Sequence, residues 1–483
     1  MRSIVIHGHF YQPPRDDPWL GTLPREASAA PYHDWNERIE RESYGPVAAS
    51  LVSLSFDFGP TLLAWMERYA AGTYRAVLAA DRAGVALHAG HGNAIAMPYH
   101  HTILPLSPRR DKETEVRWGI ADFRRRFGRE AEGMWLPETA VDDETLDVLA
   151  AEGIRFTILA PHQVERVPAL GRPGWHRTAG GRRIALFLYD GALSHDVAFG
   201  PLVRDPAAWI ERLTAREGGN GGGGGGGGGG GSAEVPEILA IATDGETFGH
   251  HHREGVVTLA RVLEALSKRG DVRIDTFAAF LARHAPQDDV KLVAPSAWSC
   301  PHGVERWRSD CGCRVHGDRA TQQRWRAPLR HALDWLAAEL HGVFEREGGG
   351  IFAADPWAAR DAYGAVLGAS DDAVARFIGE RLRRPDDGSA LARARELLEL
   401  ERHALRMFTS CGWFFDDIAG LESLIVLRSA ARAIELAGSD AARLEAGLLE
   451  RLALAPSNDP AVGSGRELYL RSVKAVSSRG VPT

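Results

Sequence analysis

The sequence predicts an α/β protein in which an incomplete (β/α)7 barrel is followed by a helical C-terminal region. Seven short β-rich runs recur within roughly the first 280 residues, and amphipathic stretches separate most of them. Such an alternation indicates a parallel sheet covered by helices. After about residue 287 the β pattern fades and only helix-like runs follow. An open, doubly wound sheet is the alternative arrangement of the same units.

Each predicted strand is short and rich in β-branched or aromatic residues, as buried strands are. In chain order they are 3–7, 85–88, 132–135, 155–159, 183–189, 237–243 and 272–277. The predicted helices carry apolar residues three and four positions apart. In the first region they are 61–80, 112–127, 143–152, 206–216 and 255–268. In the second region they are 320–345, 371–383, 389–407, 421–436 and 441–454.

These elements divide the chain into three parts. We expect a barrel at 1–285, a Trp/Cys-rich connection lining the cleft at 286–315, and a helical domain at 316–483. Residues 218–231 contain 13 glycines and one asparagine, a composition that predicts a flexible loop. This tract follows a predicted helix and precedes a predicted strand. It therefore belongs to the face opposite the expected site, and it is not a phosphate-binding loop, which would follow a strand.

Composition excludes several function classes. The chain has 57 basic and 64 acidic residues, a net charge of −7, and no basic run, so we expect no nucleic-acid partner. No apolar run reaches the length of about 18 residues that a membrane helix needs, and the N-terminus lacks the apolar segment of a signal peptide. Four cysteines are too few for a disulfide scaffold. We expect a cytoplasmic protein without a membrane contact, and the oligomeric state stays open.

Polar and titratable residues follow six of the seven predicted strands, where a parallel barrel places its functional side chains. In strand order they are His7, His9, Tyr11 and Gln12; His88, His91 and Asn93; Glu138; His162; Asp190; Asp244 and Glu246. Glu138 and Asp244 stand out because each directly ends an apolar strand. Two carboxylates that face one cleft are what cleavage of a glycosidic bond requires. Flat faces for sugar rings could come from Trp135, Trp298, Trp307 and Trp413, with core packing as the alternative for each.

Four segments resemble the ordered signature regions of glycoside hydrolase family 57, the α-amylase-like family. They are Ile-His-Gly-His-Phe-Tyr-Gln-Pro at 6–13, Pro-Tyr-His-His-Thr-Ile-Leu-Pro-Leu at 98–106, Trp-Leu-Pro-Glu at 135–138 and Asp-Gly-Glu-Thr-Phe-Gly at 244–249. The resemblance covers roughly residues 1–285. It implies an incomplete, TIM-like (β/α)7 barrel whose cleft a helical region completes. It also implies a retaining mechanism on α-glucans, with Glu138 as nucleophile and Asp244 as acid/base.

The two roles set expectations for the pair. A retaining enzyme holds its two carboxyl groups about 5–5.5 Å apart. Asp244 must be protonated when the leaving group departs, so we expect its pKa to be raised, chiefly by the charge of Glu138, with help from burial and from Glu246. Around the pair we expect a polysaccharide or oligosaccharide to contact His7, His9, Gln12, His101, Trp135, Glu246, Trp298, Trp413, Asp416 and Asp417.

The sequence departs from the family pattern at two places. The second region often has a Glu where Asn93 falls, and the fifth usually has an Asp shortly before a Trp, whereas here Trp413 precedes Asp416 and Asp417. These changes affect sugar contacts more than the chemistry. Amylase, 4-α-glucanotransferase and branching activities therefore all stay open.

Metal chemistry is the main alternative. Cys300, His302, Cys311 and Cys313 could build a thiolate zinc site, but each pair is separated by one residue instead of the usual two to four or so. We therefore expect free thiols there and at Cys411, and no metal or cofactor. His7, His9, His101 and His250–His252 could hold a catalytic metal, as in carbohydrate deacetylases, although those enzymes have paired aspartates after the first strand. A non-catalytic glycan-binding protein is the third possibility, and the presence of both carboxylates disfavours it.

Overall fold

The structure is a computed structural model that describes residues 1–215, 237–317 and 320–474. The glycine tract at 218–231, expected to form a flexible loop, lies outside the described residues. The strands form two sheets, in the orders β2-β1-β6, with β7 also paired to β1, and β3-β5-β4. Their bounds are β1 Arg2–Phe10, β2 Ser55–Phe58, β3 Phe156–Leu159, β4 Gly174–Arg177, β5 Arg183–Leu188, β6 Ile238–Asp244 and β7 Val272–Ile274.

Strand β1 is the centre of the first sheet. It pairs in parallel with β2, β6 and β7, and all its residues from Ser3 to Phe10 are buried. A run such as Ile4-Val5-Ile6 suits this position because a strand covered on both faces has no need of alternating polar residues. The apolar N-terminal run of the sequence is therefore the core strand of the barrel-like region.

Isolated bridges continue the parallel pairing beyond the regular strands. Phe56 of β2 pairs with Ala94, Ala96 pairs with Met134, and Gly133 pairs with Phe156 of β3, all in parallel. At the other side, the Asp190 N–H, just after β5, donates to the Ala240 carbonyl of β6 at 2.7 Å. The two sheets are thus connected at both sides, which gives a barrel-like α/β fold.

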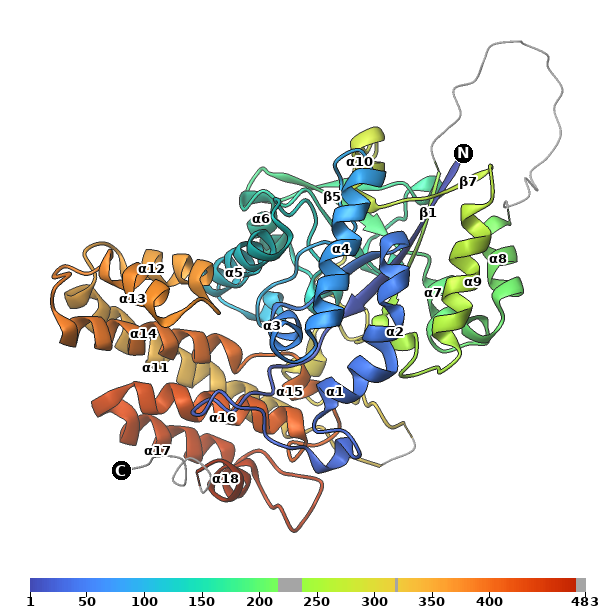
Figure 1. Cartoon of the computed structure of the whole chain (residues 1–483). Helices are drawn as coiled ribbons and strands as arrows, with labels where there is room; N and C mark the ends of the chain where they lie inside the picture. The colour runs from blue at the N-terminus through green and yellow to red at the C-terminus, as the bar shows by residue number, and fades with distance from the viewer. Residues whose placement is uncertain (216–236, 318–319, 475–483) are drawn as a thin grey trace, which may run out of the picture.

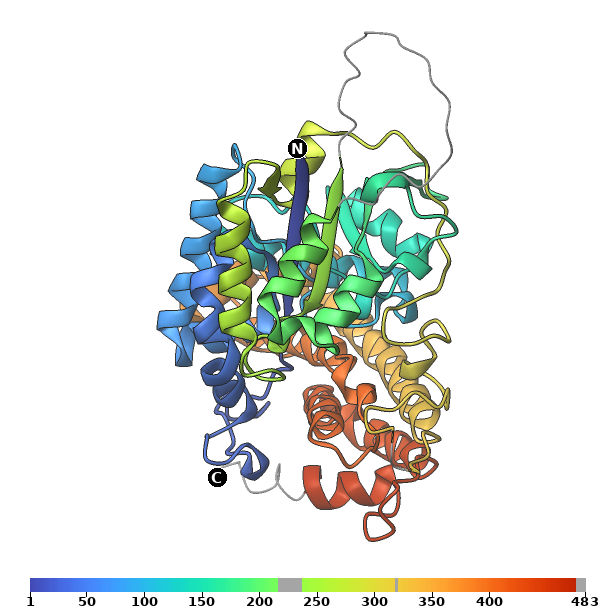
Figure 2. The same ribbon diagram turned by 90° about the vertical axis from the view of Figure 1, so that its right-hand side faces the viewer.

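Helices cover the outside of this sheet structure and surround β1 in the two views (Figures 1 and 2). The helices of the first region are α1 Trp35–Ile39, α2 Gly45–Val47, α3 Pro60–Tyr69, α4 Ala71–Leu87, α5 Arg109–Phe127, α6 Asp143–Ala151, α7 Gly191–Ala198, α8 Pro206–Thr214, α9 Gly255–Ser267 and α10 Phe277–Arg283. None of the helices in the described residues is both long and apolar enough to span a membrane.

The second region is helical, as expected. Its helices are α11 Arg326–Ile351, α12 Pro356–Tyr363, α13 Asp371–Gly379, α14 Gly388–Arg406, α15 Cys411–Phe414, α16 Leu421–Leu436, α17 Ala441–Leu452 and α18 Gly465–Tyr469. Leu329, Leu333, Leu336 and Leu340 of α11 recur on one face and are fully buried in its core. Figures 1 and 2 show these helices gathered beyond the end of β1 that lies away from the N-terminus. The carboxyl ends of the strands therefore face the helical region.

Several elements differ from the sequence prediction. The strand predicted at 132–135 is reduced to isolated bridges at Gly133 and Met134. The strand predicted at 85–88 is wrong, because those residues end helix α4, whose buried Val77, Ala80, Asp81 and Gly84 recur at helical spacing. The true second strand, β2, was not predicted, since only two of its four residues, Phe56 and Phe58, are apolar. The single helix predicted at 61–80 is two helices, α3 and α4. Strand β4, antiparallel to β5, was also missed.

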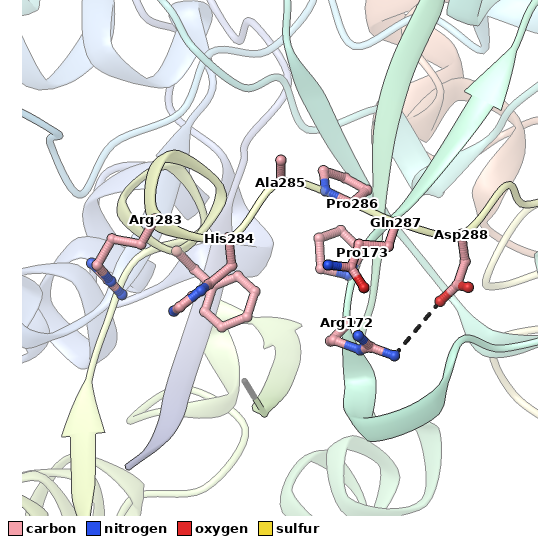
Figure 3. Close-up of a pocket in the computed structure, with 9 residues that line it drawn as sticks. Arg172, Pro173, Arg283, His284, Ala285, Pro286, Gln287 and Asp288 are labelled. Atoms are coloured by element: carbon pink, nitrogen blue, oxygen red, sulfur yellow. Dashed lines mark ion pairs between the residues drawn. The ribbon is translucent and has the colours of Figure 1, made fainter. Parts of the chain in front are cut away.

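A cavity of about 370 Å³ lies beside α10, between Arg283 and His284 on one side and Arg172 and Pro173 on the other (Figure 3). Arg172 pairs across its edge with Asp288 at 3.7 Å. Helix α10 follows β7, which pairs with the first residues of β1. This cavity is therefore at the amino end of the strands, opposite the predicted carboxylate pair.

Candidate active site

Three titratable residues lie side by side at the carboxyl ends of adjacent strands. His9 on β1 is in register with Asp57 on β2 and with Asp244 on β6. Parallel pairing places residues in register beside each other, so one histidine stands between two carboxylates. Sequence reasoning identified His9 and Asp244 but missed Asp57, because β2 was not recognised. The available signal was a lone acid between two phenylalanines.

Asp57 is completely buried between two histidines. Its Oδ1 lies 3.0 Å from His7 Nε2 and its Oδ2 lies 2.8 Å from His9 Nδ1. Burial by itself would raise the pKa of Asp57, but the charge of His9 and the hydrogen bonds from both rings outweigh burial and lower that pKa. Asp57 is therefore an ionised carboxylate in the core, satisfied by its two neighbours.

His9 is a cation at neutral pH. Burial opposes its charge, but Asp57 outweighs burial and raises the pKa of His9 to about 9. Its Nε2 lies 3.3 Å from His101 Nε2, and burial together with the charge of His9 lowers the pKa of His101 well below its ordinary value. Protonated His9 therefore donates to neutral His101. The other ring nitrogen of His101, Nδ1, then donates to Ser410 Oγ at 2.6 Å.

Glu138 is presented by a left-handed turn. Glu138 has φ 57° and Thr139 has φ 48°, a conformation that residues other than glycine adopt rarely. Its Oε2 accepts hydrogen bonds from Trp298 Nε1 at 3.1 Å and Ser299 Oγ at 2.5 Å. Its own carbonyl accepts the Trp298 N–H at 3.0 Å. The segment at 298–299 thus fixes both the backbone and the carboxylate of Glu138.

Gln163 and His162, which follow β3, hold this turn and the neighbouring segment in place through hydrogen bonds. Gln163 Nε2 donates to the Thr139 carbonyl at 2.8 Å, and Thr139 Oγ1 donates to Gln163 Oε1 at 2.8 Å. His162 Nε2 lies 3.1 Å from the Ala297 carbonyl, so it contacts the segment that leads to Trp298. These bonds compensate the strain of the left-handed residues and keep Glu138 aimed into the site.

Asp244 ends β6 and is half-buried. Burial raises its pKa to about 7, with further contributions from the charges of Glu246 and then Glu138, while His9 acts in the opposite direction. The direction agrees with expectation, but the order of causes does not, because burial and Glu246 contribute more than Glu138. Glu246 is nearly buried, accepts the Tyr44 hydroxyl, and has its own pKa raised by burial.

Two residues near the carboxylates were not predicted from the sequence as part of the site. Tyr189 follows β5, and burial together with the charge of Asp244 raises its pKa. Its ring lies 6.4 Å from that of Trp298, edge to face. Cys411 begins α15, and burial together with the charges of Glu422 and Glu138 raises the pKa of its thiol well above the ordinary value. The site therefore draws side chains from the helical region as well as from the barrel.

The predicted substrate contacts fall into two groups. His7 and Trp135 are completely buried, and the Trp135 ring stacks on His7 at 4.7 Å and on His9 at 5.4 Å. They support the site from behind, contrary to the expectation that they touch a sugar. Trp298 is half-buried, with its ring 5.2 Å from that of Trp135, edge to face. Gln12 is half-buried too, and its Oε1 accepts Arg15 at 3.2 Å.

The three predicted contacts from the helical region serve the scaffold. Trp413 is 1% exposed in the helical core and donates to the Arg326 carbonyl, so it presents no face to a sugar. Asp416 accepts the backbone N–H groups of Val315 and His316 at 2.8 and 2.9 Å. Asp417 accepts the Ser457 hydroxyl and the Asn458 backbone N–H. Acidic residues in this loop cap neighbouring chain segments, which is why they are present without a ligand.

Comparison with known proteins gives two family matches. Residues 62–292 match glycosyl hydrolase family 57, and residues 322–479 match a family described as Domain of unknown function (DUF3536). No curated protein matches the chain.

Solved structures share the fold at low sequence identity. An exo-type maltose-forming amylase from Pyrococcus sp. ST04 has a TM-score of 0.74 at 16% identity, over 100% of this chain and 92% of that one. A 4-α-glucanotransferase from Thermococcus litoralis has a TM-score of 0.55 at 15% identity, over 90% and 59%. A GH57-type branching enzyme from Pyrococcus horikoshii has a TM-score of 0.53 at 16% identity, over 94% and 88%.

Proposed function

Residues 62–292 of this chain belong to glycosyl hydrolase family 57, and from this premise we propose that the protein is a retaining glycosidase or transglycosylase that acts on α-glucans. The observation that carries the proposal is that two unlike carboxyl groups, Asp244 and Glu138, interact electrostatically in one site. Asp244 has a pKa raised to about 7, as an acid catalyst needs. Glu138 is held by two hydrogen-bond donors, as an ionised nucleophile would be.

The chemistry follows from these two roles. The Glu138 carboxylate attacks the anomeric carbon while Asp244 gives its proton to the departing glycosidic oxygen, so a glycosyl ester forms as the bond to the leaving sugar breaks. The negative charge of Glu138 disappears in this ester. Loss of that charge lowers the pKa of Asp244, and the ionised Asp244 then accepts a proton from the incoming hydroxyl, which displaces Glu138 and restores the enzyme.

The incoming hydroxyl decides between hydrolysis and transfer. Water yields hydrolysis, and a sugar hydroxyl yields a new glycosidic bond from the same intermediate. The maltose-forming amylase and the 4-α-glucanotransferase that share the fold are named for one outcome each. We take α-1,4-linked glucan as the donor substrate for both.

We further propose that the parallel segments close as a (β/α)7 barrel. The supporting contacts are the bridges from Phe56 through Ala96 to Phe156 and the bond from Asp190 to Ala240. The barrel extends over 1–285, the connection over 286–315 and the helical domain over 316–483. None of the four cysteines forms a disulfide, which suits a protein of the cytoplasm.

The test compares wild type with Glu138→Gln, Asp244→Asn and the control Asp190→Asn on maltooligosaccharides. Asp190 also follows a strand, but its carboxylate caps helix α7 through Leu193, a role that asparagine can fill. We expect Glu138→Gln to lose at least about 1,000-fold in kcat and Asp190→Asn to retain activity. Proton NMR of the first product should show a retained α-anomer. An inverted product, or full activity in Glu138→Gln, would overturn the proposal.

An activated substrate isolates the role of Asp244. On an aryl glycoside whose leaving group needs no proton, the first step of Asp244→Asn should be much less impaired than on maltooligosaccharides. Equal impairment on both would show that Asp244 is not the acid, and Glu246 would be tested next.

The metal-hydrolase alternative is disfavoured by the histidines themselves. The facing nitrogens of His7 and His9 are hydrogen-bonded to Asp57, and the remaining nitrogen of His9 faces His101. Of the predicted triplet, His250 is bonded to Glu42 and His252 to the Ala198 carbonyl, so these rings do not converge with the others on one point.

A further inference from the structure

The connection between barrel and helical region contains a cluster of soft donor atoms. The thiols of Cys300, Cys311 and Cys313 and a ring nitrogen of His302 all lie within 4.8 Å of one another. Cys313 Sγ lies 3.8 Å from Cys300 Sγ and 3.7 Å from His302 Nδ1. A disulfide would need sulfur atoms about 2.05 Å apart. The observed spacing therefore belongs to separate thiols arranged around a common centre.

These spacings are those of a tetrahedral zinc site. Two sulfurs about 2.3 Å from a tetrahedral zinc lie about 3.8 Å from each other, and a sulfur and an imidazole nitrogen lie about 3.6 Å apart. The measured distances of 3.8 and 3.7 Å agree with both values. We propose that Cys300, His302, Cys311 and Cys313 bind one Zn²⁺ ion as a structural Cys3His site.

The unusual sequence spacing is explained by the backbone. The two cysteines at 311 and 313 are separated only by Gly312, which has φ 79°. Successive side chains of an extended chain point to opposite sides, and a left-handed glycine at the intervening position allows the chain to turn tightly between the two thiols. The ligand pair thus forms without the spacing of about two to four residues that sequence patterns require.

Buried positive charge around the cluster supports an anionic centre. Arg306 and Arg326 are buried, and each has a buried Nε without a hydrogen-bond partner. Arg326 Nη1 donates to the Cys313 carbonyl at 3.0 Å, and neither side chain forms an ion pair with a carboxylate in the described parts of the chain. Unpaired buried charges are costly. Three thiolates, a neutral imidazole and Zn²⁺ carry a net charge of −1, which supplies the missing counter-charge.

The site has a structural use. Between α10 and α11 the only helix-like element in the described residues is a single turn at Glu305–Trp307, and so long an irregular stretch needs an anchor. Cys300 directly follows Trp298 and Ser299, the two donors to Glu138. Zinc would therefore fix the segment that aims Glu138, a consequence that rests on the function proposed above, whereas metal binding itself does not.

Metal analysis tests the site independently of turnover. We expect wild type, expressed with zinc and dialysed against a weak chelator, to retain about one zinc per chain. Cobalt substitution should produce intense visible bands of tetrahedral Co²⁺ and thiolate-to-cobalt absorption in the near ultraviolet. Less than about 0.1 zinc per chain together with absent cobalt bands would overturn the proposal, as would a disulfide among the three cysteines in the metal-free, unreduced protein.

Variants locate the ion. His302 is exposed, so His302→Ala should fold, and we expect it and Cys311→Ser to raise the zinc Kd at least about tenfold. Cys411→Ser is the matched control for metal content, since that thiol lies outside the cluster. Unchanged zinc affinity in both cluster variants would refute the assignment. If zinc is present but Glu138→Gln stays fully active, the metal site stands and the proposed catalytic role falls.

Discussion

We predict that the Asp244 carboxyl group lowers the free energy of unfolding at neutral pH. In the folded chain its pKa is raised from 3.8 to about 7, so between these values the folded state holds a proton that the unfolded state has lost. The free energy of unfolding then falls as pH rises through this window and levels off above about 7. An asparagine at this position cannot ionise, so the variant does not lose unfolding free energy in this pH window. We therefore predict that Asp244→Asn stabilises the protein while it impairs catalysis.

The size of the gain follows from the shift. Linkage over the full shift gives about 4 kcal/mol at pH 8 and about 2 kcal/mol at pH 5. Solvent screening at this half-buried carboxyl reduces both figures. We expect the variant to gain about 2 to 4 kcal/mol at pH 8 and about 1 to 2 kcal/mol at pH 5.

Denaturant unfolding of wild type and variant at pH 5, 6.5 and 8 measures this gain. Asp57→Asn is a control of opposite sign, because the pKa of Asp57 is lowered and its loss should destabilise the protein at neutral pH. A gain for Asp244→Asn that does not change with pH would refute the reasoning, and so would a loss of stability that grows as pH rises.

Three further predictions concern rate, positioning and scaffold. The kcat/KM on maltooligosaccharides should fall above about pH 7 as Asp244 of the free enzyme loses its proton; a profile of kcat/KM that still rises at pH 8 contradicts this. Trp298→Phe keeps a ring but removes one donor to Glu138, and we expect kcat to fall about tenfold or more, whereas Trp209→Phe, whose buried Nε1 has no partner, should leave kcat unchanged. Asp416→Ala should lower the free energy of unfolding by about 1–3 kcal/mol and leave kcat unaltered at a temperature where the variant is folded. A loss of kcat without a loss of stability would instead indicate that Asp416 belongs to the active site.

The strands that were predicted correctly are those with an uninterrupted apolar run in the local sequence. The run Ile4-Val5-Ile6 and the run ending at Asp244 are continuous and apolar, so each predicts a buried strand without reference to the rest of the chain. Strand β2 has four residues, and Ser55 and Asp57 interrupt its apolar pattern. Its assignment depends on pairing with β1 and on His7 and His9, which satisfy those polar groups. Such long-range compensation is invisible to a local pattern.

The same distinction separates the site residues. Glu138 and Asp244 were selected as candidates because predicted strand ends and signature segments mark them. Trp413 and Asp416 were misassigned because an aromatic and acidic loop has the composition of a binding loop, whereas burial and backbone capping depend on partners about 90 to 100 residues away in the sequence. The Cys3His cluster was weighed and set aside for its spacing, since nothing in the letters reveals that Gly312 turns left-handed.

Strand β1 is synthesised before its neighbours, and its pairing is completed late. Its neighbours on either side are β2, at residues 55–58, and β6, at residues 238–244. A ribosome that adds about 5–20 residues per second needs about 10–50 s to pass from the end of β1 to the end of β6. Throughout that interval one edge of strand β1, which carries the apolar run Ile4-Val5-Ile6, lacks its partner, and His9 lies beside Asp57 without Asp244. This open strand edge is exposed to aggregation during synthesis, and the proposed catalytic pair can assemble only after half of the printed sequence has been synthesised.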